Sequence, residues 1–242
     1  MTPRLLLDAG NTRLKWAWLE AREWRGHGVV DYDALAQLTP RLRGKFDCVV
    51  ASVAGAERDA QIGDWLASVG VAPRWLDTGC GSSAVVSRYA PGQLGVDRWM
   101  ALLAARRRAA TAALVVSAGT ALTIDALGGD GVFHGGLIVP GLRMMAQALA
   151  GGTAHVGELS GRWQDFPQTT ADAVHSGAVN ALCGAIEAQY ARLEAMAGPV
   201  PRCLLTGGDA DVLLAHLKLP AEPLPLLVLE GIEYASREGR QE

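Results

Sequence analysis

The turn DAGNT, at residues 8–12, combines residue types that could hold a phosphate group. Asp8 ends an apolar run, and a carboxylate buried there needs hydrogen-bond donors or a cation such as a metal ion. Gly10 has no Cβ to block a ligand, so the main-chain N–H groups of the turn can face an anion. Lys15, on the next apolar segment, could place its ammonium group over a phosphate. An ordinary hairpin turn uses the same residue types, so this motif does not decide the chemistry by itself.

Two further glycine turns follow apolar segments. SAGTALT, at residues 117–123, repeats the pattern of an apolar strand, a Gly-Thr turn and a second strand. TGGDA, at residues 206–210, precedes a helical segment, where the main chain and the electropositive helix N-terminus could accept a ligand. Either turn could be purely structural. Three apolar strands that each end in a polar glycine turn nevertheless favour a shared ligand, and two such turns facing one cleft would hold an oligophosphate from both sides.

The segment GVDRW, at residues 95–99, is the best candidate for the reacting end of a site. Asp97 lies at a predicted helix start, where the helix dipole favours an ionised carboxylate. Such a carboxylate can accept the proton of a hydroxyl group that attacks phosphorus. Arg98 could bind a substrate carboxylate through two hydrogen bonds. The alternative is an N-cap aspartate beside a solvated arginine.

The elements that would position these residues form two runs with the same opening. Each run begins with a strand, a glycine turn and a second strand, at residues 4–20 and 114–127. We therefore expect an internally duplicated α/β architecture with a cleft between two halves, residues 1–111 and 112–242. The pattern predicts further strands at 47–53, 132–139 and 203–210, and helices at 60–69, 97–108, 142–150 and 211–218, with one more from Thr169 or Thr170 to Ala197.

The composition excludes several classes of protein. Of the 242 residues, 50% are hydrophobic and 19% are charged, which is typical of a globular protein rather than a disordered one. A formal net charge of −3 does not favour nucleic acid or an anionic membrane as a partner. The four cysteines lack metal-ligand spacing and are expected to be reduced thiols. We find no signal peptide and no apolar run of about 18 residues, so we expect no membrane association and a cytoplasmic location.

In this order, the segments DAGNTRLK, GVDR, SAGTALTID, GGLIVPG, TTADAVHSG and TGGDA resemble the motifs of the type III pantothenate kinases. The resemblance extends from Asp8 to Ala210. It implies the acetate and sugar kinase, heat-shock chaperone and actin superfamily, with a duplicated ribonuclease-H-like fold and ATP between the halves. It also implies a homodimeric enzyme that uses Mg-ATP to phosphorylate pantothenate at its primary hydroxyl, the first step of coenzyme A biosynthesis.

The resemblance further implies roles for individual residues. Asp97 matches the proton acceptor, and Tyr89 matches a tyrosine that contacts the substrate. Thr170 matches a pantothenate-contacting threonine that often reaches across from the dimer partner. Asp8 matches the residue near the Mg²⁺ of Mg-ATP, acting through water, and Thr120 matches a contact to the ATP phosphates. The other implied contacts are Ala9, Gly10, Asn11, Thr12, Arg13, Leu14, Lys15, Gly207 and Gly208 for ATP, and Gly95, Val96 and Arg98 for pantothenate.

Ser117 departs from the family pattern. Many members have aspartate here, which helps to bind an activating monovalent cation, K⁺ or NH₄⁺. Ser117 supplies no fixed charge, so the cation site can be weakened, moved to other oxygens or absent, and we expect reduced dependence on potassium. Two other functions remain open, a kinase for another small alcohol and a non-catalytic regulator of the same fold. Retention of Asp8, Lys15 and Asp97 argues against the regulator.

Overall fold

The computed structural model describes residues 2–42, 44–81, 83–90, 92–108, 110–152, 161–197 and 200–238. The chain forms two compact units. Unit 1 contains Met1–Arg108 together with Leu226–Glu242, and unit 2 contains Ala109–Pro225. Among the described residues, no helix is both long enough and apolar enough to cross a membrane.

The sheet of unit 1 is built on a central hairpin of apolar strands. Its strands are β1 (Arg4–Ala9), β2 (Leu14–Glu20), β3 (Glu23–Val30), β4 (Asp47–Ser52) and β5 (Pro73–Trp75), in the order β3-β2-β1-β4-β5. The first three pair in antiparallel fashion, and β4 joins β1 in parallel. Because β1 is covered on both faces, Leu5, Leu6 and Leu7 are all buried, as expected of a central strand.

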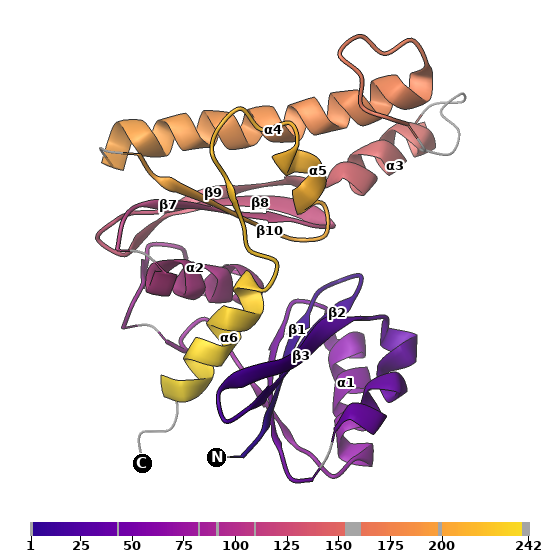
Figure 1. The fold of residues 1–242 in the computed structure, drawn as a ribbon, viewed down its shortest axis with the longest axis vertical. Helices are drawn as coiled ribbons and strands as arrows, with labels where there is room; N and C mark the ends of the chain where they lie inside the picture. The colour runs from indigo at the N-terminus through magenta and orange to yellow at the C-terminus, as the bar shows by residue number, and fades with distance from the viewer. Residues whose placement is uncertain are drawn as a thin grey trace. The chain divides into compact units, whose positions relative to one another are not determined.

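Helices cover both faces of this sheet. The 3₁₀ helix η1 (Tyr32–Arg41) and helix α1 (Ala56–Ser68) lie on one face (Figure 1). They bury Leu35 and Ile62 against the strands. On the other face, α2 (Val96–Arg108) packs against α6 (Leu227–Glu238), and both contact β4. The two helices approach closely where Gly231 meets the carbonyl of Met100, since a Cβ on Gly231 would lie 1.9 Å from that oxygen. The short strand β6 (Val86–Ser87) completes the elements of this part of the chain.

Unit 2 repeats the strand plan of unit 1. Its strands β7 (Ala113–Ala118), β8 (Ala121–Leu127), β9 (Val132–Pro140), β10 (Arg202–Thr206) and β11 (Glu222–Pro223) lie in the order β9-β8-β7-β10-β11. Again the first three are antiparallel, and the fourth joins the first in parallel. The connections contain α3 (Leu142–Gly152), α4 (Thr170–Ala197) and α5 (Ala210–Leu214). The long helix α4 extends along the sheet (Figure 1). It buries Val179 and Ile186 in the core of the unit.

Most of the predicted elements are present, and several elements are additional. Thr169 is the cap of α4, because its hydroxyl accepts the main-chain N–H of Asp172 at 3.1 Å. The helix predicted at 211–218 is shorter, since α5 ends at Leu214. The sequence analysis did not predict β3, η1, β5, β6, β11 or α6. The observed break after Arg108 lies three residues from the predicted one at 111, but residues 226–242 belong to unit 1 rather than to the second half.

Candidate functional site

An ion pair marks the end of the central hairpin in unit 1. Asp8 and Lys15 occupy paired positions on β1 and β2, which places their side chains on the same face of the sheet. The Lys15 Nζ lies 3.6 Å from Asp8 Oδ2. Asp8 is only 6% exposed. Burial raises the pKa of Asp8 to about 6; Lys15 opposes this shift and the charge of Asp97 adds to it.

Asp97 belongs to the same charged group, although it is 89 residues from Asp8 in the sequence. Its charge raises the pKa of Asp8, and Lys15 in turn acts on Asp97. Burial raises the pKa of Asp97 above its ordinary value, while the main-chain N–H and the guanidinium of Arg98 oppose the shift. The helix start therefore stabilises the carboxylate as expected, but burial has the larger effect. Asp8, Lys15 and Asp97 thus form a charged cluster at the carboxyl end of β1.

The neighbouring residues leave little room around the Asp97 side chain. A Cβ on Gly95 would lie 2.5 Å from Asp97 Oδ1, so only glycine leaves this carboxylate where it is. Arg98 is 5% exposed, and its Nη1 donates to the Tyr89 hydroxyl at 3.4 Å. The Arg98 guanidinium also lies 5.2 Å from the centre of the Tyr89 ring. The structure places Tyr89, Gly95, Asp97 and Arg98 near one another, whereas the Val96 side chain is buried in the core.

Tyr32 is a member of this site that sequence analysis missed. Its buried hydroxyl donates to the carbonyl oxygen of Gly10 at 2.5 Å, which fixes the main chain of the DAGNT turn. Burial raises the pKa of Tyr32 to about 12, and the charge of Asp8 adds to the shift, so the hydroxyl keeps its proton at neutral pH. The Arg58 guanidinium lies 4.7 Å from the centre of the Tyr32 ring. No local pattern around Tyr32 indicates this long-range contact.

The other residues expected to bind ATP in the first turn fall into two groups. Asn11, Thr12 and Arg13 are exposed and could reach a ligand with their side chains. Ala9 and Leu14 are fully buried and paired across β1 and β2, so only their main chain faces the turn. Their role is to anchor the hairpin on which the turn rests.

Three glycine motifs meet at the end of β7 in unit 2. The N–H of Gly141, in the VPG segment, donates to the carbonyl of Thr120 at 2.9 Å. A Cβ on Gly141 would lie 2.1 Å from the carbonyl oxygen of Gly119, and a Cβ on Gly207 would lie 2.0 Å from that of Ala118. The SAGT turn is thus packed directly against GGLIVPG and TGGDA. Thr120 and Gly208 are exposed at this junction, where they could contact a ligand.

Ser117 lies beside a second hydroxyl. It is paired in register with Thr206 of β10, whose Oγ1 is buried with no hydrogen-bond partner among the described residues. A site at this position would offer neutral oxygens. Thr170 lies elsewhere in unit 2, exposed at the start of α4, where it lines an apolar groove of about 460 Å³ together with Met145 and Leu149 of α3.

The fit of Mg²⁺ can be judged from the donors present. No group of three or more His, Cys, Asp or Glu side chains gathers at a metal-binding distance within the described residues. Mg²⁺ in nucleotide sites needs only one or two carboxylates, since water and phosphate oxygens complete its coordination. A buried carboxylate whose pKa is raised by burial and by a second carboxylate suits an added cation. Asp8 therefore fits the role of holding Mg²⁺ through water.

The repeated strand order, with a glycine turn after the first strand of each unit, defines a duplicated ribonuclease-H-like fold, the fold of actin-like ATPases and sugar kinases. A structure from Campylobacter jejuni assigned to the Baf family of transcriptional activators has a TM-score of 0.62 at 19% identity, covering 98% of this chain and 100% of that one. Component A of (R)-2-hydroxyglutaryl-CoA dehydratase from Acidaminococcus fermentans has a TM-score of 0.52 at 13% identity, covering 97% and 96% of the two chains.

Sequence comparison identifies the family within this fold. The family described as type III pantothenate kinase matches residues 4–192. The type III pantothenate kinase of Thiobacillus denitrificans is 49% identical over 237 residues, covering 98% of this chain and 97% of the relative. The chain therefore belongs to the type III pantothenate kinase family.

Proposed function

We propose that Asp97 is the general base of this kinase, which phosphorylates pantothenate with ATP to give 4′-phosphopantothenate in coenzyme A biosynthesis. The observation that carries the proposal is the position of Asp97 in the first turn of α2, next to the buried Arg98 that contacts Tyr89. The charges of Asp97 and Lys15 also affect the pKa of Asp8 at the end of β1. A carboxylate with a raised pKa is a better proton acceptor at neutral pH than an ordinary one. Asp97 is also the member of the charged cluster that directly precedes Arg98, whose guanidinium group contacts Tyr89.

The residues of unit 1 have different roles in the reaction. Lys15 and the main-chain N–H groups of the DAGNT turn bind the phosphates of ATP, and Tyr32 holds that turn through Gly10. Arg98 binds the carboxylate of pantothenate and is itself oriented by Tyr89. Asp97 accepts the proton of the attacking hydroxyl. Asp8 would hold Mg²⁺ through water, and the bound ion would supply positive charge to the phosphates.

The residues of unit 2 hold the rest of the nucleotide. Thr120 donates its hydroxyl to a phosphate oxygen, and the main chain at Gly207 and Gly208 contacts the nucleoside end of ATP. The packing of the SAGT turn against TGGDA supports this assignment, because one ligand can then reach both turns.

Replacing Asp97 by Asn tests the proposed base. The amide keeps the shape of the side chain but cannot accept a proton, so we expect kcat to fall about 10²- to 10⁴-fold. Pantothenate binding, measured by calorimetry, is expected to survive because Arg98 and Tyr89 are unchanged. Arg25→Gln, on the exposed strand β3, is the control variant. Near-full turnover by Asp97→Asn would remove Asp97 from the role of base.

Ser117 leads us to propose a reduced requirement for a monovalent cation. The support is that Ser117 and its neighbour Thr206 offer hydroxyl oxygens without a fixed charge, and neutral oxygens hold K⁺ weakly. We expect turnover in a sodium buffer to be within a few-fold of that in potassium or ammonium. Ser117→Asp is expected to increase the response to K⁺. A strong, saturating requirement for potassium in the unmodified enzyme would contradict this proposal.

We also propose that the enzyme acts as a homodimer in the cytoplasm. The family resemblance supports the dimer, and so does the groove next to Thr170, whose apolar walls on α3 and α4 suit cover by a second chain. In such a dimer, Thr170 would reach the pantothenate bound by the partner.

A further inference from the structure

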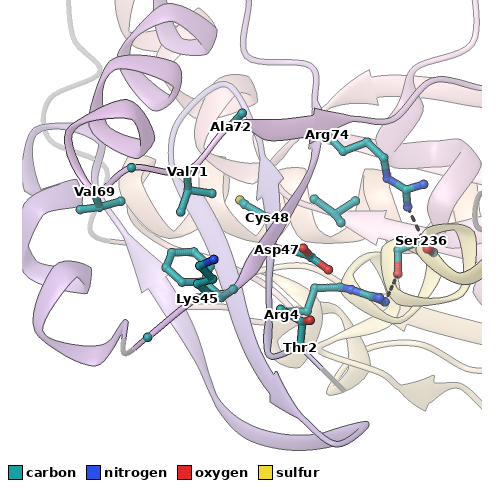
Figure 2. Close-up of a pocket in the computed structure, with 14 residues that line it drawn as sticks. Thr2, Arg4, Lys45, Asp47, Cys48, Val69, Val71, Ala72, Arg74 and Ser236 are labelled. Atoms are coloured by element: carbon teal, nitrogen blue, oxygen red, sulfur yellow. Dashed lines mark hydrogen bonds between the residues drawn. The ribbon is translucent and has the colours of Figure 1, made fainter.

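A cavity in unit 1 lies at the opposite end of the sheet from the charged cluster. This cavity of about 670 Å³ is lined by Arg4 and Asp47, the first residues of β1 and β4, which are paired in register (Figure 2). Asp8 is four residues further along β1, about 13 Å away at roughly 3.3 Å per residue. The cavity is therefore separate from the residues assigned to ATP and pantothenate.

The charges around this cavity favour an anion. Among the described residues that line the cavity, Arg4, Lys45 and Arg74 are cationic and Asp47 is a carboxylate. The local excess is thus two positive charges, in a protein whose net charge is −3. Two of the three cations are arginines, whose planar guanidinium groups match the geometry of carboxylates and phosphates.

The two guanidinium groups are held in place by one buried residue. Arg4 Nη1 donates to Ser236 Oγ at 2.6 Å, and Arg74 Nη2 donates to the Ser236 carbonyl oxygen at 2.9 Å. Both side chains converge on Ser236 in Figure 2, and Ser236 is 1% exposed. Its hydroxyl donates in turn to the carbonyl of Glu233, one turn earlier in α6. Since Ser236 orients both arginines before any ligand arrives, less entropy is lost when a ligand binds.

A structural role explains part of this arrangement. The contact from Arg74 to a carbonyl in the last turn of α6 is typical of arginine at a helix C-terminus. A guanidinium group carries five N–H donors, however, and this contact uses the Nη2 atom. It also does not account for a cavity of this size with Lys45 at its rim.

We propose that this cavity binds a small organic anion with a phosphate or carboxylate head and a short apolar body. The head lies between Arg74 and Lys45, and the body packs against Phe46 and Val71, which also line the cavity. Both parts contribute, because charge-assisted hydrogen bonds hold the head and apolar burial holds the body.

Phenyl phosphate and benzoate are suitable probes, because they carry the two kinds of head on the same apolar ring. Titration of the full chain by calorimetry is expected to show binding of at least one of them. The probe that binds more tightly shows whether the site prefers a phosphate or a carboxylate group. Inorganic phosphate and phenol, which each supply one part, are expected to bind more weakly. Absence of binding by both probes at millimolar concentration would overturn the proposal.

Variants locate the binding. Arg74→Gln is expected to lower the affinity for the more tightly bound probe about tenfold or more, because it removes a charged hydrogen-bonding partner. Lys45→Gln is expected to weaken it by a smaller factor without affecting folding, since Lys45 is exposed. Two control variants are expected to leave the affinity for the probe unchanged. They are Arg25→Gln, on the far edge strand β3, and Lys15→Ala, next to the DAGNT turn. Loss of binding in Lys15→Ala with retention in Lys45→Gln and Arg74→Gln would assign the probe to the ATP site and overturn the proposal.

Discussion

At the scale of single residues, the site holds charged side chains where burial and mutual repulsion disfavour their charges. Asp8 is a carboxylate in a buried strand, with a second carboxylate, Asp97, close enough to raise its pKa. Lys15 offsets this repulsion only in part, since it lies 3.6 Å away and is itself partly exposed. Such a conflict between burial and charge is typical of functional sites, where a ligand supplies the missing counter-charge. In the function proposed above, this ligand is a hydrated cation bound with ATP.

The raised pKa of Asp8 predicts how stability depends on pH. Because folded Asp8 keeps its proton up to pH about 6 and unfolded Asp8 only to about 3.8, the folded state binds more protons between these values. The free energy of unfolding should therefore fall as the pH rises through this window, by up to about 3 kcal/mol from this residue.

The variant Asp8→Asn lacks this titration. We expect it to be close to the unmodified protein in stability near pH 4 and more stable above pH 7, although its use of ATP is impaired. Urea unfolding of both proteins at several pH values between 4 and 8 measures the difference. Two parallel stability curves would show that Asp8 does not titrate as proposed.

At the scale of elements, the same device is used twice. In each unit, an antiparallel pair of strands closes on a glycine turn, at Gly10 in unit 1 and at Gly119 in unit 2. In unit 2, neighbouring main chain packs so closely against this turn that side chains are excluded at Gly141 and Gly207. The glycines of GGLIVPG and TGGDA therefore serve the fold directly as well as any ligand.

Gly207→Ala tests the importance of this packing. Gly207 has a φ of +108°, and a Cβ there would lie 2.0 Å from the Ala118 carbonyl oxygen. We expect the free energy of unfolding to fall by about 2 kcal/mol or more, with a higher KM for ATP, since the two turns must separate. Gly184→Ala is the matched control, because that helical position has open space and alanine should stabilise α4 slightly. Equal stability of the two variants would argue against the close approach.

At the scale of the whole molecule, the chain does not divide into two consecutive halves. The last helix, α6, belongs to unit 1, where it packs along α2 and buries Leu227 and Ile232. Since Asp97 lies in the first turn of α2, the C-terminal segment supports the helix that carries the proposed base. The core of unit 2 is formed by residues between Ala112 and Leu213.

Ending the chain at Pro225 should therefore affect the two units differently. Loss of α6 exposes apolar side chains of α2 and of one face of β1, so we expect amide exchange to become much faster in these elements. The amides of β7 and β10 should stay protected, because their packing within unit 2 does not involve residues after Pro225. Hydrogen exchange followed by mass spectrometry makes this comparison, and equal loss of protection in both units would contradict it.

Local patterns in the sequence predicted the recurring strand-turn-strand openings, most helices and the glycine turns. These features depend on residue periodicity, on capping and on turn residues, which act over a few positions. Only the tertiary structure showed the interactions between distant segments. These join Tyr32 with Gly10, Asp97 with Asp8, and Arg4 with Ser236, which are 232 positions apart. The tertiary structure also decided the placement of α6, because a helix with one apolar face can cover many surfaces, and only the complete fold shows which surface remains open to it.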